Sequence, residues 1–263
     1  MKPQSIQNYL SGVKLLHILL GFEYTFSGDF HLRLTVRGIA RLNPHVPRRA
    51  RPITPSDLLN FHGSMDRGCA LHCAVYACSL LLFFTMSRLG SILPRSGAAS
   101  GRLFLTRDCI NFSEEGMLIT LQHTKTIQFG RRRLHIPLIK LDSALCPVAA
   151  YRRSLGFSGS YRSHVAFVVP DGRGRFGGLT KSLFINTFRD VMAASGDGDA
   201  VGFTGHSFRR GGASWAFRAG IPGELIQVCG DWSSDAYKKY LEFSMINRLE
   251  LAVHFAKSLV CSV

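Results

Sequence analysis

Acidic residues are scarce in this sequence of 263 residues, which has 17 Asp and Glu against 32 Lys and Arg. The formal net charge of +15 repels other copies of the chain and attracts polyanions, so nucleic acid or an anionic membrane surface leads the list of expected partners. The few carboxylates form no cluster of the kind that metal-dependent nucleases use. We therefore expect neither a metal ion nor another cofactor.

Paired cysteines are also missing. The seven cysteines are an odd number and contain no CxxC pair, and the chain starts without a secretory signal sequence. These features predict reduced thiols in an intracellular protein. If the host is eukaryotic, we expect the protein in the nucleus. Cys69, His72 and Cys73 would share one face of a helix, so a metal site is an alternative there. The preferred interpretation is that they are small buried side chains of a core helix.

Long hydrophobic runs are limited to one segment, residues 69–86, which has about the length of a membrane-spanning helix. The segment contains His72 and several cysteines and serines, and it runs directly into Arg88. We interpret it as the buried central helix of a domain and expect no membrane partner. A membrane-associated basic protein is kept as an alternative.

The residues that are present predict a folded chain. Hydrophobic residues make up 46% of the sequence and aromatic residues 11%, and the basic residues are interleaved with apolar ones. A disordered basic tail would lack both features. The positive charge is therefore expected on the surface of a packed protein.

Prolines and hydrophobic periodicity divide the chain. Amphipathic helices are expected over residues 5–20 and 31–42, followed by a segment, 43–52, with three prolines and three arginines. We predict a partial helical domain over residues 1–45, a linker over 46–53 and a second domain over 54–263.

The second domain is predicted to be mainly α-helical with one small antiparallel β-sheet, an α+β fold. Thr54 suits the N-cap of a helix with Pro55 in its first turn and Asp57 near its positive end. Alternating apolar residues predict strands near 117–121 and 134–138, and a turn over 113–116 indicates an earlier strand at 109–112. The three strands are expected to form a meander. Further helices are expected over 146–155, 180–195, 207–219, after Pro222 up to Gly230, 233–242 and 245–259.

His206 and Arg209 lie three residues apart at the expected start of a helix, so both side chains can reach one ligand. The free amides of a helix start favour an anion. An arginine offers a fork of donors and a histidine offers a donor or a proton acceptor, so phosphate is the natural ligand. The pair alone is a weak signal.

The longer string is specific. It runs from Thr204-Gly-His-Ser-Phe-Arg-Arg to Gly230-Asp-Trp-Ser-Ser-Asp-Ala-Tyr-Lys-Lys-Tyr. It resembles the signature of the tyrosine recombinase (phage integrase) superfamily, particularly the versions carried by eukaryotic mobile elements. That family has an ordered set of Arg, Lys, His-x-x-Arg, His or Trp, and Tyr. Matching residues occur here in the same order: Arg88, Lys125, His206, Arg209, Trp232 and Tyr240.

The resemblance covers roughly residues 52–260 and implies the catalytic fold of DNA breaking and rejoining enzymes. Residues 1–45 resemble the end of the family's DNA-clamping helical domain. The implied function is site-specific recombination or integration of double-stranded DNA by a tetramer, without a cofactor. Arg88 and Arg209 would hold the phosphate, Trp232 would donate to it, and His206 would assist proton transfer. Tyr240 would form a 3′-phosphotyrosine and Lys125 would protonate the leaving oxygen.

Several alternatives remain at this point. Tyr237 shares a helix face with Tyr240, but Tyr240 is preferred because it lies eight residues after Trp232, closer to the family's spacing than Tyr237 at five. A catalytically inactive, mobile-element-derived DNA-binding protein is the leading rival, and residues 214–228 allow a helix-turn-helix interpretation. Residues 245–260 are predicted to dock on a neighbouring subunit, or to pack within the same chain.

Overall fold

The computed structural model describes residues 3–26, 28–44, 50–95, 103–127, 132–158, 165–171 and 174–241, together with Val253. The chain forms two compact units, Met1–Arg49 and Ala50–Val263. Assignment of the first unit to a DNA-clamping domain, and the boundaries 1–45, 46–53 and 54–263, stay predictions.

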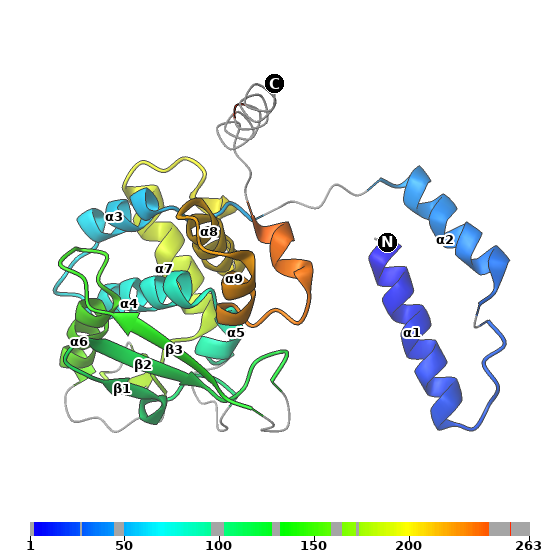
Figure 1. Cartoon of the computed structure of the whole chain (residues 1–263), viewed down its shortest axis with the longest axis horizontal. Helices are drawn as coiled ribbons and strands as arrows, with labels where there is room; N and C mark the ends of the chain where they lie inside the picture. Colours follow the sequence, from blue (N-terminus) through cyan, green and yellow to red (C-terminus); the bar gives the residue numbers. More distant parts are fainter. Residues whose placement is uncertain are drawn as a thin grey trace, which may run out of the picture. The chain divides into compact units, whose positions relative to one another are not determined.

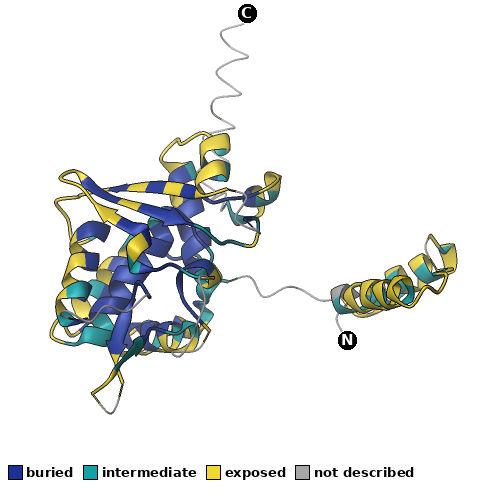
Figure 2. Cartoon of the chain, turned by 90° about the horizontal axis from the view of Figure 1, so that it is seen from below, coloured by how far each residue is buried: buried dark blue, intermediate teal, exposed yellow. Residues whose placement is uncertain are grey.

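The first unit consists of two helices that pack against each other, α1 (Pro3–Leu19) and α2 (Phe30–Leu42). The Asp29 carboxylate begins α2 by accepting a hydrogen bond from the Leu32 amide at 2.8 Å. None of the residues 5–26 and 28–44 is buried, as the teal and yellow colouring of these helices in Figure 2 shows. This unit therefore has no apolar core of its own within the described residues.

The second unit is built around one buried helix, α4 (Ala70–Thr85). Helix α4 packs against α3 (Pro55–Ser64), α6 (Pro147–Ser158), α7 (Lys181–Ala194) and α8 (Gly205–Arg218). Figure 1 shows it between the three-stranded sheet and helices α7 and α8. Twelve of its residues are buried, which confirms the prediction of a central core helix. Within the described residues, no helix combines the length and the apolar character needed to cross a membrane.

Local sequence signals account for where several helices begin. Thr54 is the N-cap of α3, as predicted, and it forms a reciprocal capping box with Asp57, which was not predicted. The Asp57 carboxylate also accepts from Arg51 at 2.8 Å. Arg51 makes two further hydrogen bonds of 2.8 Å to Asp197, which ties the segment before α3 to the turn after α7. The shorter helical elements are α5 (Leu89–Ile92), α9 (Gly223–Cys229) and the 3₁₀ turns η1 (Arg107–Cys109) and η2 (Ala200–Gly202).

The predicted meander is present as strands β1 (Ile110–Phe112), β2 (Gly116–Leu121) and β3 (Leu134–Ile139), in the order β1-β2-β3. Both pairings are antiparallel, and Ile119 lies opposite Ile136. Side chains of β3 alternate between buried and exposed, as expected for a sheet with one face on the core. A second sheet, formed by β4 (Val168–Pro170) and β5 (Phe176–Gly178), was not predicted. Each of these strands has only three residues, too few to show a periodicity.

The expected helix over 233–242 is replaced by a 3₁₀ element, η3 (Asp235–Tyr240). This prediction of an α-helix was wrong, and the segment packs on α8 and α9 instead of extending as a regular helix. The expected helix over 245–259, with its docking role, lies outside the described residues except for Val253.

A pair of glycines lets α8 approach the backbone on both of its sides. A Cβ on Gly212 would lie 2.0 Å from the Phe83 carbonyl oxygen, and one on Gly211 would lie 2.0 Å from that of Ile53. A Cβ at either position would clash with a carbonyl oxygen unless the backbone moved. Gly212 therefore sets how closely α8 packs against the end of α4, and Gly211 sets how closely it packs against the segment before α3.

We expect Gly212→Ala to lower the free energy of unfolding by about 3 kcal/mol, because the new methyl group forces two backbone segments apart. Urea unfolding followed by circular dichroism measures the change. Gly156→Ala in α6 is the matched control, since no atom lies within 4 Å of the added Cβ. It should raise stability by up to about 1 kcal/mol through helix propensity. Equal midpoints for the Gly212 variant and the parent would contradict the packing argument.

Candidate active site

The first turn of α8 presents His206 and Arg209. The Thr204 side chain accepts from the His206 amide at 3.2 Å, and the Ser207 hydroxyl accepts from the Thr204 amide at 2.9 Å. These two bonds fix the helix start and leave the two side chains in different settings. His206 is exposed, whereas Arg209 is 1% exposed.

The Arg209 guanidinium is buried but only partly hydrogen-bonded. Nη1 donates to the Met86 carbonyl oxygen, and the guanidinium carbon lies 3.6 Å from the centre of the Trp232 ring. Nε and Nη2 have no hydrogen-bond partner in the described part of the chain. Burial and the nearby Arg88 lower the pKa of Arg209 to about 10, while Tyr240 and Asp231 act in the opposite direction. Arg209 is therefore still charged at neutral pH.

Trp232 provides a second buried donor that has no hydrogen-bond partner among the described residues. Its side chain is 6% exposed, and the donor is the indole Nε1. The ring lies so close to the chain that a Cβ on Gly230 would be 1.7 Å from it. A buried donor without a partner costs about 1–3 kcal/mol, and more when it is charged, so such groups are rare. Two of them in contact indicate a place for an acceptor that both can reach, and an anion suits a charged donor best.

Tyr240 lies beside these donors. Its ring centre is 5.5 Å from that of Trp232, 6.4 Å from that of His206 and 5.6 Å from the Arg209 guanidinium carbon. The Tyr240 carbonyl oxygen accepts from the Ser214 hydroxyl at 2.9 Å, which attaches the end of η3 to α8. Tyr240 is half-buried, so its phenol is within reach of both the donors and solvent.

Tyr237 occupies a different setting. It is 6% exposed and packs on Trp232 with ring centres 6.2 Å apart. Its hydroxyl oxygen would be 2.3 Å from a Cβ on Gly223, so the phenol is directed at the start of α9. The ring contacts with His206 and Arg209 are made by Tyr240 instead.

The pKa of His206 lies below its ordinary value of 6.5. The main cause is partial burial of the ring, and the positive charges of Arg209 and Arg88 add to it. The imidazole is thus neutral at pH 7 and able to accept a proton. The unfolded chain binds this proton at a higher pH than the folded chain does. Folding stability is therefore lost as the pH falls below about 6.5.

We expect an NMR titration to place the His206 midpoint below 6.5. The free energy of unfolding of His206→Gln should fall less steeply than that of the parent between pH 7 and pH 5, because the variant lacks the group that must be protonated on unfolding. The same acid slope in both proteins would contradict this account of His206.

Arg88 and Lys125 line a cleft of about 760 Å³. Arg88 is half-buried at the start of α5, and its charge lowers the pKa values of both His206 and Arg209. Lys125 is exposed on the connection between β2 and β3. His123, Arg95 and Lys181 line the same cleft, so it is strongly basic.

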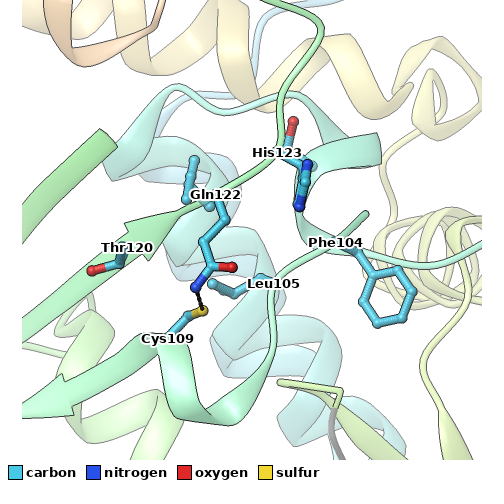
Figure 3. A pocket seen from close by; sticks show the side chains of 8 residues that line it. Phe104, Leu105, Cys109, Thr120, Gln122 and His123 are labelled. Atoms are coloured by element: carbon cyan, nitrogen blue, oxygen red, sulfur yellow. Dashed lines mark hydrogen bonds between the residues drawn. The ribbon is translucent and has the colours of Figure 1, made fainter. Parts of the chain in front are cut away.

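The base of that connection is fixed to the sheet. The Gln122 side-chain nitrogen donates to the Cys109 sulfur at 3.3 Å, which joins the end of β2 to η1. Figure 3 shows this bond and shows the His123 ring lying apart from it.

Of the six residues that the resemblance names, four lie in one group of ring and cation contacts, namely His206, Arg209, Trp232 and Tyr240. Arg88 acts on two of them through its charge, and Lys125 shares its cleft.

Comparison with solved structures relates this architecture to known proteins. XerA recombinase matches with a TM-score of 0.56 and 16% identity over 97% of this chain and 84% of that one. Lambda integrase (residues 75–356), solved as a dimer bound to a COC′ core site, matches with a TM-score of 0.51 and 15% identity over 92% and 80% of the two chains. XerH site-specific recombinase, solved bound to a palindromic difH substrate, matches with a TM-score of 0.54 and 15% identity. That match covers 78% of this chain and 52% of the XerH chain.

The chain has the catalytic-domain fold of the tyrosine recombinases. This confirms the fold predicted from the resemblance. A search of protein-family models and a search of curated proteins gave no match.

One residue of this recombinase fold was missed by sequence analysis. Asp231 is buried between Gly230 and Trp232, and its carboxylate accepts from Thr124, Thr126 and Arg132. A hydrophilic residue next to a glycine is typical of an ordinary turn, so nothing local marks it. Its partners lie about a hundred positions earlier in the chain, and only the tertiary structure shows them.

The alternative metal site at Cys69, His72 and Cys73 is not assembled in the recombinase fold. His72 Nδ1 accepts from the Asp66 amide at 3.1 Å, and the Cys73 thiol donates to the Arg67 carbonyl oxygen at 3.4 Å. The described residues contain no group of three or more His, Cys, Asp or Glu side chains arranged to hold a metal ion. The His72 and Cys73 side chains instead stabilise the turn that precedes α4.

Proposed function

We propose that this protein cuts and rejoins double-stranded DNA at specific sites through a covalent 3′-phosphotyrosine formed by Tyr240. The observation that carries the proposal is the contact between two buried, incompletely paired donors, Arg209 and Trp232, beside the Tyr240 ring. A phosphodiester supplies the acceptor oxygens that these donors lack, and Tyr240 is the nearby nucleophile. The fold of known recombinases supports the same assignment.

Binding of the scissile phosphate follows from the positions of the cations. Arg209 Nε and Nη2 donate to its non-bridging oxygens, and the Trp232 indole N–H donates to one of them. Arg88 adds a second positive charge from the cleft side. These groups are buried or half-buried, so they stabilise the charge that develops on the phosphorus centre more strongly than exposed groups do.

The reaction exchanges one phosphate ester for another. The Tyr240 oxygen attacks phosphorus and its proton passes to the neutral His206. The bond between phosphorus and the 5′-oxygen breaks, and that oxygen takes a proton from Lys125. The product is a 3′-phosphotyrosine and a free 5′-hydroxyl. A second 5′-hydroxyl reverses the steps, so rejoining needs neither ATP nor an oxidant.

The partner and the assembly follow the same reasoning. Double-stranded DNA fits the net charge of +15 and the basic cleft. We propose that the chain acts as a tetramer on two DNA sites, with residues 245–260 docking on a neighbour, and that a eukaryotic host would hold it in the nucleus. An origin in a mobile element belongs to the same proposal.

The test uses the purified full chain and a pool of short duplexes of randomised sequence, each with a nick in one strand. Cleavage close to the nick releases a short fragment with a 5′-hydroxyl, so rejoining fails and the covalent product accumulates. A protein–DNA adduct that survives denaturing electrophoresis supports the proposal. DNA binding without any adduct would contradict it and favour the catalytically inactive DNA-binding protein.

A further inference from the structure

Asp231 is a buried acidic residue at an unusual backbone position. Its side chain is 4% exposed and its φ is +56°, in the left-handed region. Residues with a Cβ enter this region at some energetic cost, and they remain there when the surrounding structure holds them. The contacts of the carboxylate show what holds Asp231.

Three side chains from the connection between β2 and β3 donate to this carboxylate. The Thr124 hydroxyl donates to Oδ2 at 2.5 Å, the Thr126 hydroxyl donates to the same oxygen, and Arg132 Nη2 donates to Oδ1. Hydrogen bonds to a buried carboxylate are among the stronger ones in proteins. The connection is therefore attached to Asp231 from both of its ends.

The attached segment is the turn that carries Lys125. The Thr124 hydroxyl also accepts from the backbone amides of Thr126 at 3.2 Å and Ile127 at 3.0 Å, and the Thr124 amide donates to the Ile127 carbonyl oxygen at 3.2 Å. Thr124 and Thr126 flank Lys125 directly. The Thr124 hydroxyl thus stabilises the turn and also helps to attach it to Asp231.

The other side of Asp231 is joined to the phosphate-binding group. The next residue, Trp232, stacks on Arg209, and its backbone is held to α9 by two hydrogen bonds with Gln227, one from the Trp232 amide at 3.0 Å and one to its carbonyl oxygen at 3.2 Å. Asp231 therefore lies between a fixed backbone and an exposed turn.

We propose that Asp231 is a positioning residue, which holds the Thr124–Thr126 turn, and with it Lys125, at the site formed by Arg209, Trp232 and Tyr240. The reaction part of this inference rests on the proposed function, whereas the attachment of the turn does not. Loss of the carboxylate frees the turn. Lys125 then protonates the leaving 5′-oxygen less often, and the groups that bind phosphate and attack it keep their places.

Attachment is tested on the DNA-free protein by the rate of tryptic cleavage after Lys125, identified by fragment mass. We expect Asp231→Asn to raise this rate about tenfold or more, because the turn opens more often. Cleavage after Arg152 in α6 serves as the internal reference and should not change. Asp235→Asn is the control variant, since that exposed carboxylate pairs only with Lys238 among the described residues. An unchanged rate after Lys125 would overturn the proposal.

The effect on chemistry is tested with two versions of a duplex selected from the nicked pool, one with a 5′-oxygen leaving group and one with a 5′-sulfur. A thiolate leaves without a proton, because the pKa of a thiol is far below that of an alcohol. Asp231→Asn should slow adduct formation about tenfold or more with oxygen and less than about twofold with sulfur, as should Lys125→Ala. Equal slowing with both leaving groups would show that Asp231 acts elsewhere.

A second variant separates the carboxylate from the backbone. Asp231→Gly removes the acid and accepts the positive φ without strain, so the chain still folds. It should behave as Asp231→Asn does, and recovery of the parent's rates in this variant would overturn the proposal. If the parent forms no adduct while trypsin still detects the attached turn, the proposed function fails and the attachment by Asp231 stands.

Discussion

Tyr240→Phe is expected to lower formation of the covalent adduct by at least about 10⁴-fold, because the variant lacks the only atom that bonds to phosphorus. DNA affinity should stay within about twofold of the parent value. The phenylalanine ring keeps the packing on Trp232, and the bond from Ser214 goes to the backbone carbonyl, which the substitution leaves in place. Denaturing electrophoresis with the nicked pool measures the adduct, and a filter-binding titration measures affinity.

Tyr237→Phe is the matched control. It removes a phenol three residues away on the same element, and the hydroxyl that it removes is directed at Gly223. Adduct formation should remain close to that of the parent. Loss of the adduct in Tyr237→Phe with retention in Tyr240→Phe would transfer the nucleophile to Tyr237 and contradict the assignment.

Arg209→Met is expected to separate stability from function. Adduct formation should fall by about 10³-fold, because a buried donor to the transition-state charge is lost. The free energy of unfolding should nevertheless rise by about 1 kcal/mol. A buried cation with two unpartnered nitrogen atoms is replaced by an apolar side chain of similar length, which can still pack on Trp232. This gain should exceed the loss of the hydrogen bonds to the Met86 carbonyl oxygen and to Tyr240.

Urea unfolding and the nicked-duplex assay measure the two effects on the same preparations. Arg218→Met, in the last turn of the same helix, is the control. It removes an exposed cation and should change stability by less than about 0.5 kcal/mol and adduct formation only slightly. A large loss of stability in Arg209→Met would show that Arg209 has a structural role and would contradict the phosphate-binding assignment.

Much of the fold could be predicted because it depends on neighbours in the sequence. Thr54, Pro55 and Asp57 lie within one helical turn of each other, so the start of α3 is visible in the sequence. The alternation in β2 and β3 and the apolar run of α4 are patterns of the same local kind. The three-residue strands β4 and β5 and the 3₁₀ element η3 escaped prediction because short elements are determined by what they pack against.

The candidate site divides in the same way. The order and spacing of Arg88, Lys125, His206, Arg209, Trp232 and Tyr240 are properties of the sequence, and so is the clustering of positive charge. The exposure of each side chain cannot be derived from the sequence, because it depends on segments that meet only on folding. The spacing from Trp232 already favours Tyr240 over Tyr237, but the separate settings of the two phenols appear only once α8, α9 and η3 pack together.

By itself, the sequence determined the type of the longer helices and strands, the basic character and the set of residues suited to a phosphate, since helix caps, periodicity and motif spacing act over short stretches of chain. Only the tertiary structure decided which of these groups meet. Arg209 packs on Trp232 with two of its nitrogen atoms unpartnered among the described residues because α8 and the turn after α9 meet on folding. Asp231 holds the Lys125 turn because segments about a hundred residues apart pack together. Burial also determines the energetic cost of leaving these groups unpaired, because a donor or a carboxylate removed from water loses its hydrogen bonds to water and needs a partner inside the protein.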